Sequence, residues 1–415
     1  MPRTRRVELN VIDADAFHPR YVVWELTLRC DQPCTHCGSR AGDARPSELA
    51  EAEALDVARQ LGAMGAQEVV LIGGEAYLHP AFLRVIEALR EAGVRPTMTT
   101  GGRGVDEPLA RAAARAGLAV ASVSIDGLEK THDTMRASKG SFASAMRALG
   151  LFRAEGVAIG ANTNVNRFNM HDLEPLYDRL RETGIQAWQV QLTTPLGRAA
   201  DRPDMVLQPY DLLDVLPRVA ALKTRARRDG IRLMPGNNLG YFGPEEATLR
   251  AFEEGAIEHF PGCQAGRFVM GIESDGAVKG CPSLQTAHYV GGNVRRDSLA
   301  SIWENAPELA FTRARTKDDL WGFCATCDFA DECLGGCTFT AHAILGRPGN
   351  NPYCHYRART MRSRGLRERL VHAEAAPGAP FDNGRFDVVV EPFDAADAPP
   401  PPTPTLLQIR RKYTH

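Results

Sequence analysis

Hydrophobic and polar positions follow two alternating periods from Tyr21 onward. Short apolar runs typical of strands alternate with longer segments whose apolar residues recur every three to four positions, as in helices. The predicted strands are Tyr21–Leu28, Glu68–Ile72, Arg95–Thr100, Ala119–Ile125, Ala158–Asn164 and Trp188–Leu192. The predicted helices between them are Ser47–Met64, Ala81–Ala92, Glu107–Ala116, Phe142–Glu155 and Asp172–Thr183. This alternation predicts an α/β fold with a parallel sheet, which right-handed crossovers curl into a partial barrel of six βα units.

The pattern changes after the sixth strand. A helix is predicted over Leu212–Arg228, and residues 255–360 then show little periodicity, as expected where metals replace an apolar core. Asn383-Gly384 before an alternating segment predicts a hairpin, and Pro399–Pro402 is typical of a spacer. We therefore expect an N-terminal extension (1–20), a barrel (21–235), an irregular domain (236–365) and a C-terminal extension with a flexible, Pro-rich end (366–415).

Composition narrows the functions to consider. The 415 residues carry a net charge of −2, so no long-range field favours nucleic acid or an anionic membrane. No apolar run is long enough to cross a bilayer, and no secretory signal is recognisable, which predicts a cytoplasmic protein. Because the cytosol keeps thiols reduced, the ten cysteines favour metal ligands or redox chemistry over disulfides.

Three of these cysteines follow the first predicted strand. Cys30, Cys34 and Cys37 form a C-x3-C-x2-C loop, which could bind three irons of a [4Fe–4S] cluster and leave the fourth iron open. Three alternatives stay open on spacing alone. They are a zinc knuckle with His36 as fourth ligand, a disulfide with one thiol left over, and chance clustering.

The segment Cys30–Cys37 resembles the signature of the radical S-adenosylmethionine (SAM) superfamily, with His36 where an aromatic residue is usual. The resemblance implies that the amino and carboxylate groups of SAM chelate the open iron. One electron from the cluster then cleaves SAM to methionine and a 5′-deoxyadenosyl radical, which abstracts hydrogen from a substrate.

Further motifs follow in the order of that family. Gly73-Gly74-Glu75 resembles its GGE motif, in which the carboxylate holds the SAM ammonium group, and Ser124-Ile125-Asp126-Gly127 with Arg136 resembles its fourth-strand segment. A strand end and a helix cap are the alternative interpretation of the latter. The resemblance implies that Gly73 and Gly74 let the backbone approach SAM, that Glu75 holds its ammonium group, that Ser124 and Asn164 contact its ribose, and that Arg136 binds its carboxylate. Gln191 is a further candidate, which points either to the barrel mouth or into packing.

The other seven cysteines fall in one block. Twelve residues separate Cys263 from Gly276, and four more separate Gly276 from Cys281. Cys324-x2-Cys327-x5-Cys333-x3-Cys337 and finally Cys354 complete a series that resembles the SPASM domain, the auxiliary-cluster domain of many radical SAM maturases. A pair of zinc ribbons is the alternative.

The resemblance implies two auxiliary clusters, hence three [4Fe–4S] clusters in all. Cys324, Cys327, Cys333 and Cys354 would bind one completely. Cys263, Cys281 and Cys337 would bind the nearer one and leave it a ligand short, because the segment Glu253–His259 lacks the extra cysteine of some relatives. A substrate heteroatom is one candidate for that place.

Most SPASM enzymes modify peptides or proteins, so the expected substrate is a ribosomally made peptide. Pro282 and Ser283, where sulfatase maturases carry Asp, make a formylglycine-forming role less favoured. About twenty residues precede the first strand, so we expect either a separate protein that recognises the peptide or a substrate that is not guided by a leader. An electron donor such as flavodoxin or ferredoxin is also expected. The alternatives are an oxidase or decarboxylase of a small molecule such as a tetrapyrrole, and a non-enzymatic iron–sulfur carrier or zinc scaffold. The sequence identifies no catalytic acid or base.

Overall fold

The computed structural model describes residues 17–252 and 258–395. The basic N-terminal segment, most of the segment Glu253–His259 and the Pro-rich C-terminal end lie outside the described residues. In the described part, no helix has the length and apolarity needed to cross a membrane.

A curved sheet of ten strands organises the molecule, in the order β10-β9-β8-β1-β2-β3-β4-β5-β6-β7. The first seven strands run parallel: β1 Tyr21–Thr27, β2 Glu68–Gly73, β3 Arg95–Thr100, β4 Val120–Ser124, β5 Ala158–Val165, β6 Ala187–Leu192 and β7 Arg232–Pro235. β8 (Val269–Ile272) pairs parallel with β1, while β9 (Ala277–Lys279) and β10 (Val290–Asn293) add antiparallel strands. The α/β partial-barrel fold is thus confirmed, with a seventh parallel strand and a sheet that continues into the cysteine-rich region, both absent from the sequence prediction.

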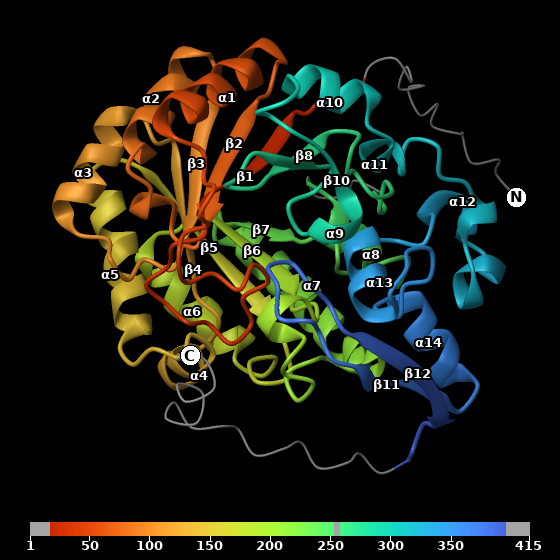
Figure 1. Cartoon of the computed structure of the whole chain (residues 1–415). Coiled ribbons are helices and arrows are strands. Elements are labelled where there is room, and N and C mark those ends of the chain that lie inside the picture. The colour runs from red at the N-terminus through yellow and green to blue at the C-terminus, as the bar shows by residue number, and fades with distance from the viewer. Residues whose placement is uncertain (1–16, 253–257, 396–415) are drawn as a thin grey trace, which may run out of the picture.

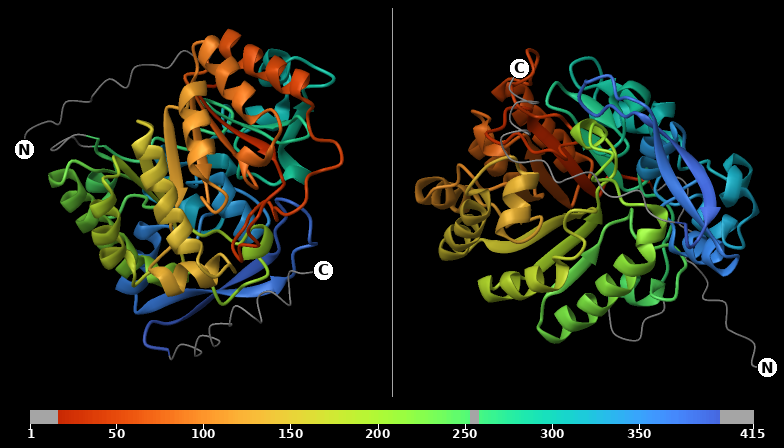
Figure 2. Two further views of the ribbon diagram at one scale, coloured as in Figure 1. Left: turned by 90° about the vertical axis from the view of Figure 1, so that its left-hand side faces the viewer. Right: turned by 90° about the horizontal axis from the view of Figure 1, so that it is seen from below.

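Helices cover the outer face of this sheet (Figures 1 and 2). They are α1 Glu51–Ala63, α2 Phe82–Glu91, α3 Glu107–Ala116, α5 Ser141–Ala154, α6 Leu173–Thr183 and α7 Leu212–Arg228. The short helix α4 (Glu129–Met135) lies instead beyond the end of β4, where the Thr35 N–H donates to the Met135 carbonyl at 2.8 Å. In α2 the buried residues Phe82, Val85, Ile86 and Leu89 recur at helical spacing and face the sheet. Burying such side chains contributes about 1.5–3 kcal/mol each, which fixes the helices against the strands.

The inner face of the sheet carries a different set of side chains. In β6, Trp188, Val190 and Leu192 are buried, while Gln189 and Gln191 alternate with them and stay partly accessible. Register places partners of neighbouring strands on the same face, and these pairs include Ser124↔Asn162, Asn162↔Gln189 and Asn164↔Gln191. Because helices cover only the outer face, this row of neutral polar groups lines the inside of the barrel.

Short helices and turns make up the C-terminal region, which reaches from β1, the partner of β8, to α7, against which α8 and α14 lie (Figure 1). Its helices are α8 Glu246–Arg250, α9 Thr286–Tyr289, α10 Leu299–Asn305, α11 Pro307–Ala310, α12 Ala330–Cys333, α13 Thr338–Leu345 and α14 His355–Ser363. A two-stranded antiparallel sheet follows, formed by β11 (Leu366–Glu374) and β12 (Arg385–Pro392). The predicted hairpin is present, but residues 375–384 form a long connection instead of a two-residue Asn-Gly turn.

Candidate functional site

The first three cysteines lie together at the carboxyl end of β1. All ten cysteines of the chain are free thiols, which excludes the disulfide alternative in this structure. Burial raises the pKa of Cys30, and the neighbouring Cys34 and Cys37 add to the rise. Burial likewise raises the pKa of Cys34 to about 11, although the Arg136 guanidinium opposes the rise. The three thiols of this loop therefore lie close enough together for the charge of one to shift the pKa of another.

Each of these sulfurs accepts a hydrogen bond. The backbone N–H of Gln32 donates to Cys30 Sγ at 3.4 Å, and that of Ala41 donates to Cys37 Sγ at 3.4 Å. Arg136 Nη1 donates to Cys34 Sγ at 3.6 Å. Donors aimed at sulfur stabilise thiolates, and hydrogen bonds to cluster sulfurs are one of the ways in which proteins tune iron–sulfur centres. The donor set thus fits an iron–sulfur cluster.

Zinc fits these thiols less well. His36 Nε2 lies 3.3 Å from Asp126 Oδ2 and its Nδ1 has no hydrogen bond, but among the described residues His36 belongs to no group of three potential ligand atoms within 4.8 Å of one another. Zinc–sulfur bonds of about 2.3 Å would hold tetrahedral ligands roughly 3.8 Å apart. Within residues 17–252 and 258–395, no three thiols have sulfurs within 4.8 Å of one another. Wider spacing is what a cube, with one iron per thiolate, requires.

Two glycines bring the second strand against the cysteine loop. Gly74 N donates to the Thr27 carbonyl at 2.7 Å, and Glu75 N donates to the Arg29 carbonyl at 2.8 Å. A Cβ on Gly74 would lie 2.1 Å from the carbonyl oxygen of Arg29. Gly73 has a φ of +158°, and a Cβ there would lie 2.2 Å from the Thr27 carbonyl oxygen. The close approach of β2 to the loop therefore requires both glycines.

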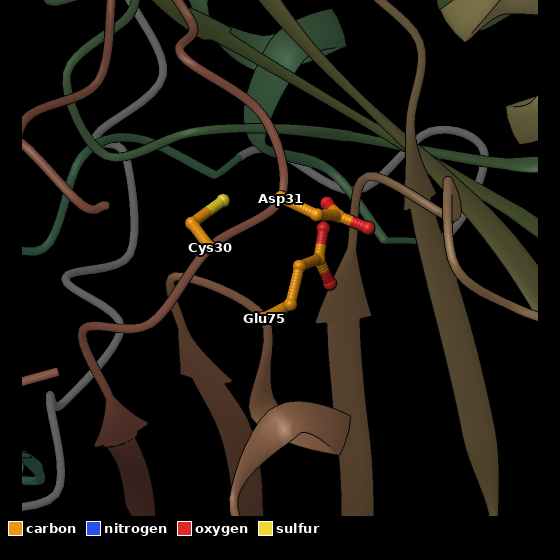
Figure 3. Close-up of side chains that lie close together, drawn as sticks. All are labelled: Cys30, Asp31 and Glu75. Carbon is orange, nitrogen blue, oxygen red and sulfur yellow. The ribbon is translucent and has the colours of Figure 1, made fainter. Parts of the chain in front are cut away.

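The Glu75 carboxylate is buried at this junction and faces Asp31 (Figure 3). Thr100 Oγ1 donates to it at 2.5 Å and the Gly101 N–H at 2.7 Å. Burial raises its pKa to about 7, and Asp31 adds to the rise while the hydrogen bonds oppose it. Ligand atoms of Cys30, Asp31 and Glu75 all lie within 4.8 Å of one another.

Asp31 was not singled out by the sequence, although it directly follows the first cysteine. Tyr77 Oη donates to Asp31 Oδ2 at 3.0 Å, while Oδ1 is buried and makes no hydrogen bond. Two facing carboxylates with an unsatisfied oxygen favour a bound cation. The ammonium group of SAM has the charge and the donors for this place, so the residues present fit the nucleotide.

Arg136 and Asp126 form a buried ion pair beside the cluster loop. Arg136 Nη2 lies 2.6 Å from Asp126 Oδ2, while Nη1 reaches Cys34. Burial opposes ionisation of Asp126, but Arg136 and His36 prevail and hold its pKa well below the usual range. Arg136, the residue predicted to bind the carboxylate of SAM, is therefore held in place by Asp126 and Cys34.

The other predicted SAM contacts lie on the inner face of the barrel. Gln191 Nε2 donates to Asn164 Oδ1 at 2.9 Å, which places both side chains at the carboxyl ends of β5 and β6. The Asn164 N–H donates to Asp126 Oδ1 at 3.0 Å, so this pair is continuous with the ion pair of Arg136. Ser124 ends β4 and is the register partner of Asn162. Gln191 thus points to the barrel mouth rather than into packing.

The seven remaining cysteines separate into two groups. Burial and then Cys263 raise the pKa of Cys281 to about 12, and Cys337 adds to this rise. Burial and then Cys324 raise the pKa of Cys333 to about 12, with a further contribution from Cys327. The two groups are Cys263, Cys281 and Cys337, and Cys324, Cys327, Cys333 and Cys354.

The group of four surrounds one pocket with about 310 Å³ of empty space. Aromatic and aliphatic side chains complete the lining: Phe242, Leu320, Phe323, Phe329, Ala330 and Tyr356, with Gly335. An apolar shell of this kind limits solvent access to a metal centre.

The group of three has aromatic neighbours. Tyr289, Phe311 and Phe339 belong to the cluster of side chains that packs around Cys263 and Cys281. Tyr289 hydrogen-bonds to His342 Nδ1 at 2.8 Å, and burial and then His288 lower the pKa of His342 to about 4. A neutral His342 and a protonated Tyr289 therefore lie beside these thiols. All ten cysteines belong to the three groups, so none is left to add a fourth thiolate to this group.

Comparison with family models decides the identity. The model of the radical SAM superfamily matches residues 24–180, and that of an iron–sulfur cluster-binding domain, SPASM, matches residues 263–328. The chain is a radical SAM enzyme with a C-terminal SPASM domain. As such it binds a [4Fe–4S] cluster and SAM.

Two enzymes and two solved structures illustrate what this chain resembles over most of its length. The AdoMet-dependent heme synthase of Nitratidesulfovibrio vulgaris is 26% identical over 82% of this chain and 94% of its own. The mycofactocin maturase MftC of Mycobacterium ulcerans is 29% identical over 81% and 88%. Among solved structures, SuiB of Streptococcus suis bound to S-adenosylmethionine has a TM-score of 0.63 at 18% identity, covering 81% of this chain and 76% of SuiB. The anSMEcpe structure with AdoMet and the Cp18Cys peptide also scores 0.63 at 18% identity, covering 82% and 95%.

Proposed function

We propose that Cys30, Cys34 and Cys37 hold the SAM-cleaving cluster and leave one iron for the nucleotide. The supporting observation is that each sulfur accepts a hydrogen bond while no fourth thiol joins the loop. We assign the SAM contacts to Gly73, Gly74, Glu75, Ser124, Arg136, Asn164 and Gln191, and add Asp31 for the ammonium group.

The SPASM thiols would hold two further [4Fe–4S] clusters, which makes three in all. The group of four supplies every ligand of the distal cluster, and Cys263, Cys281 and Cys337 leave the nearer one with an open iron. A substrate heteroatom, such as a thiolate, is the proposed ligand there. Absence of any change in the spectrum of this cluster at saturating substrate would refute the assignment.

The bound cluster and SAM supply a one-electron reduction that generates the 5′-deoxyadenosyl radical, which removes hydrogen from the substrate. The chain's own residues prepare this step. Glu75 and Asp31 hold the ammonium group of SAM. The burial of Glu75 and of Asp31 Oδ1 strengthens this attraction. Arg136, fixed by Asp126, offers a guanidinium to the carboxylate end.

We propose that the substrate is a ribosomally made peptide that the enzyme modifies after translation. The single observation that carries this choice is the inner face of the barrel, where Thr99, Ser122, Asn162, Asn164, Gln189 and Gln191 are neutral donors and acceptors and are all partly accessible. Such groups match the amides of a peptide backbone. The similarity to mycofactocin maturases, and the fold shared with peptide-bound SuiB and anSMEcpe, agree with it.

A tetrapyrrole is the second candidate, because AdoMet-dependent heme synthases and the Fe-coproporphyrin III synthase of Methanosarcina barkeri resemble this chain at 26–28% identity. On this alternative the enzyme would oxidise or decarboxylate side chains of a small molecule. Tetrapyrrole carboxylates call for cations, and the six accessible side chains of the row named above are all neutral; Arg95, on the same face at the start of β3, is paired with Glu68.

The protein would work in the cytoplasm with flavodoxin or ferredoxin as electron donor and with a separate protein that recognises the peptide. Its parts would be the radical SAM core at 21–235, the SPASM domain at 236–365, and extensions at 1–20 and 366–415.

A substrate competition decides between the two candidates. The anaerobically reconstituted enzyme is incubated with SAM, dithionite and either a short peptide encoded beside its gene or an iron coproporphyrin. We expect a mass change in the peptide together with 5′-deoxyadenosine. A mass change only in the tetrapyrrole would refute the peptide proposal in favour of the alternative. As a matched test of the inner face, Gln189→Leu should raise the KM for the peptide more than it changes SAM cleavage.

A further inference from the structure

The connection between β11 and β12, residues 375–384, reaches from the C-terminal hairpin to the loop that carries the first three cysteines (Figures 1 and 2). The Phe381 N–H donates to the Gly38 carbonyl at 3.1 Å, directly after Cys37. The Gly197 N–H donates to the Asp382 carbonyl at 2.7 Å. A segment more than 340 residues away in the sequence thus contacts the cysteine loop.

Arg40 is the centre of this contact. Its backbone φ is +51°, a left-handed conformation that side chains other than glycine adopt only under constraint. Arg40 Nε donates to Asp382 Oδ1 at 2.8 Å, while Nη1 and Nη2 donate to Asp201 at 2.7 and 3.1 Å. Carboxylates on two edges of the guanidinium hold the residue in place.

The turn at Arg40 directs its neighbours to a cluster sulfur. Ala41, the next residue, donates its N–H to Cys37 Sγ at 3.4 Å. Ser39, the preceding residue, has its hydroxyl 3.5 Å from the same sulfur. Because hydrogen bonds to cluster sulfurs stabilise the reduced, more negative state, their geometry sets the reduction potential.

The hairpin tip is itself anchored from the SPASM side. Phe381 is 7% exposed and packs with Leu196 and Ala343, the latter on the helix that begins after Cys337. The buried ammonium of Lys279 lies 3.9 Å from the centre of the Phe381 ring. The Ala379 N–H donates to Asp382 Oδ2 at 2.9 Å, which fixes the second oxygen of the carboxylate. The tip therefore has little freedom to leave Arg40.

We propose that Asp382 is a positioning residue for the SAM-cleaving cluster, which sets its reduction potential through the Arg40 turn. The inference rests on the proposed function, since it takes Cys37 as a cluster ligand. Removing the Asp382 carboxylate leaves Arg40 held by Asp201 alone. The left-handed turn then loosens, the two donors move relative to Cys37 Sγ, and the reduced cluster loses stabilisation.

The test is a redox titration of the reconstituted full chain. It is monitored through the electron paramagnetic resonance signal of the reduced SAM-cleaving cluster, which is recognised because it changes when SAM is added. Arg40→Gln removes the ion pair but keeps the contacts of Asp382 within the hairpin, and Asp382→Asn removes the charge from the other side. Arg385→Gln, which breaks exposed pairs at the hairpin stem, is the control.

Both variants should keep the wild-type iron content and show a midpoint potential more negative than that of the control. SAM cleavage should slow with a weak reductant and recover with a strong one. Unchanged potentials in fully loaded variants would overturn the inference, and so would loss of iron in both variants, which would make the contact merely structural. A wild-type protein whose signal ignores SAM would instead contradict the proposed function.

Discussion

At the scale of single residues, the site depends on Gly74, where there is no room for a Cβ, and on Glu75 and Asp31, two carboxylates that need a cation beside them. Gly74 lies against the Arg29 carbonyl, so β2 can deliver Glu75 to the cysteine loop. Glu75 and Asp31 then face each other, with an unsatisfied oxygen on Asp31. The resemblance of Gly73-Gly74-Glu75 to the family's GGE motif predicted the first acid. The role of Asp31 needed the fold, because a lone Asp beside a cysteine carries no distinctive signal.

Substituting Gly74 by Ala should therefore abolish SAM binding or destabilise the protein, since the new Cβ would collide with a backbone atom that cannot move away. Binding is measured by the SAM-induced change in the cluster signal, and stability by thermal unfolding. Gly150→Ala is the control, because nothing lies within 4 Å of its Cβ and it lies in α5. The control should be neutral or gain up to ~1 kcal/mol. Equal behaviour of the two variants would contradict this account.

At the scale of elements, strand ends and cysteine groups position the chemistry. The six strands of the regular alternation were predictable from their periodicity. The cysteine loop after the first strand was visible from its spacing, whereas the division of the other seven cysteines was implied by the resemblance to the SPASM domain. β7, with four residues, was missed because it is too short to show a period, and β8–β10 were missed among glycines and cysteines. The Arg40–Asp382 pair joins residues 342 positions apart, which no local pattern reveals.

The separate location of the four distal thiols leads to a prediction about their function. Cys324→Ala or Cys354→Ala should remove the iron of the distal cluster. Most SAM cleavage should remain, because neither residue touches the loop of Cys30. Turnover of the substrate should fall strongly. Iron content, 5′-deoxyadenosine and product are measured on the same samples. Full product formation after loss of the distal cluster would contradict a role for it in the reaction.

At the scale of the whole molecule, the barrel and the SPASM domain share buried charges. Arg45 Nη2 lies 3.2 Å from Glu25 on β1 and 3.0 Å from Glu273 beyond β8. Ser274 Oγ also donates to Glu25 at 3.0 Å. The β1–β8 pairing joins the two parts into one sheet, and these buried contacts lie across the same junction.

Glu25 should make stability depend on pH. Burial raises its pKa to about 7 from an ordinary 4.5, although Arg45 opposes the rise. Between these values the folded state binds more protons than the unfolded state, so this group's contribution to stability falls as pH rises from about 4.5 to 7. Glu25→Gln should flatten that fall, measured by thermal unfolding across the window against wild type. Glu182→Gln, at an exposed pair with Arg179, should keep the wild-type slope. A Glu25→Gln slope equal to that of wild type would contradict the assignment.

The central claim is that three thiolates at the end of β1 hold a cluster with one iron free for SAM. The most direct measurement is the electron paramagnetic resonance spectrum of the reduced protein before and after SAM, combined with mass spectrometry of 5′-deoxyadenosine. We predict a shifted spectrum and 5′-deoxyadenosine from the wild type, and neither from a variant with Cys30, Cys34 and Cys37 all replaced by Ala. Zinc bound in this loop, or a spectrum indifferent to SAM, would contradict the account.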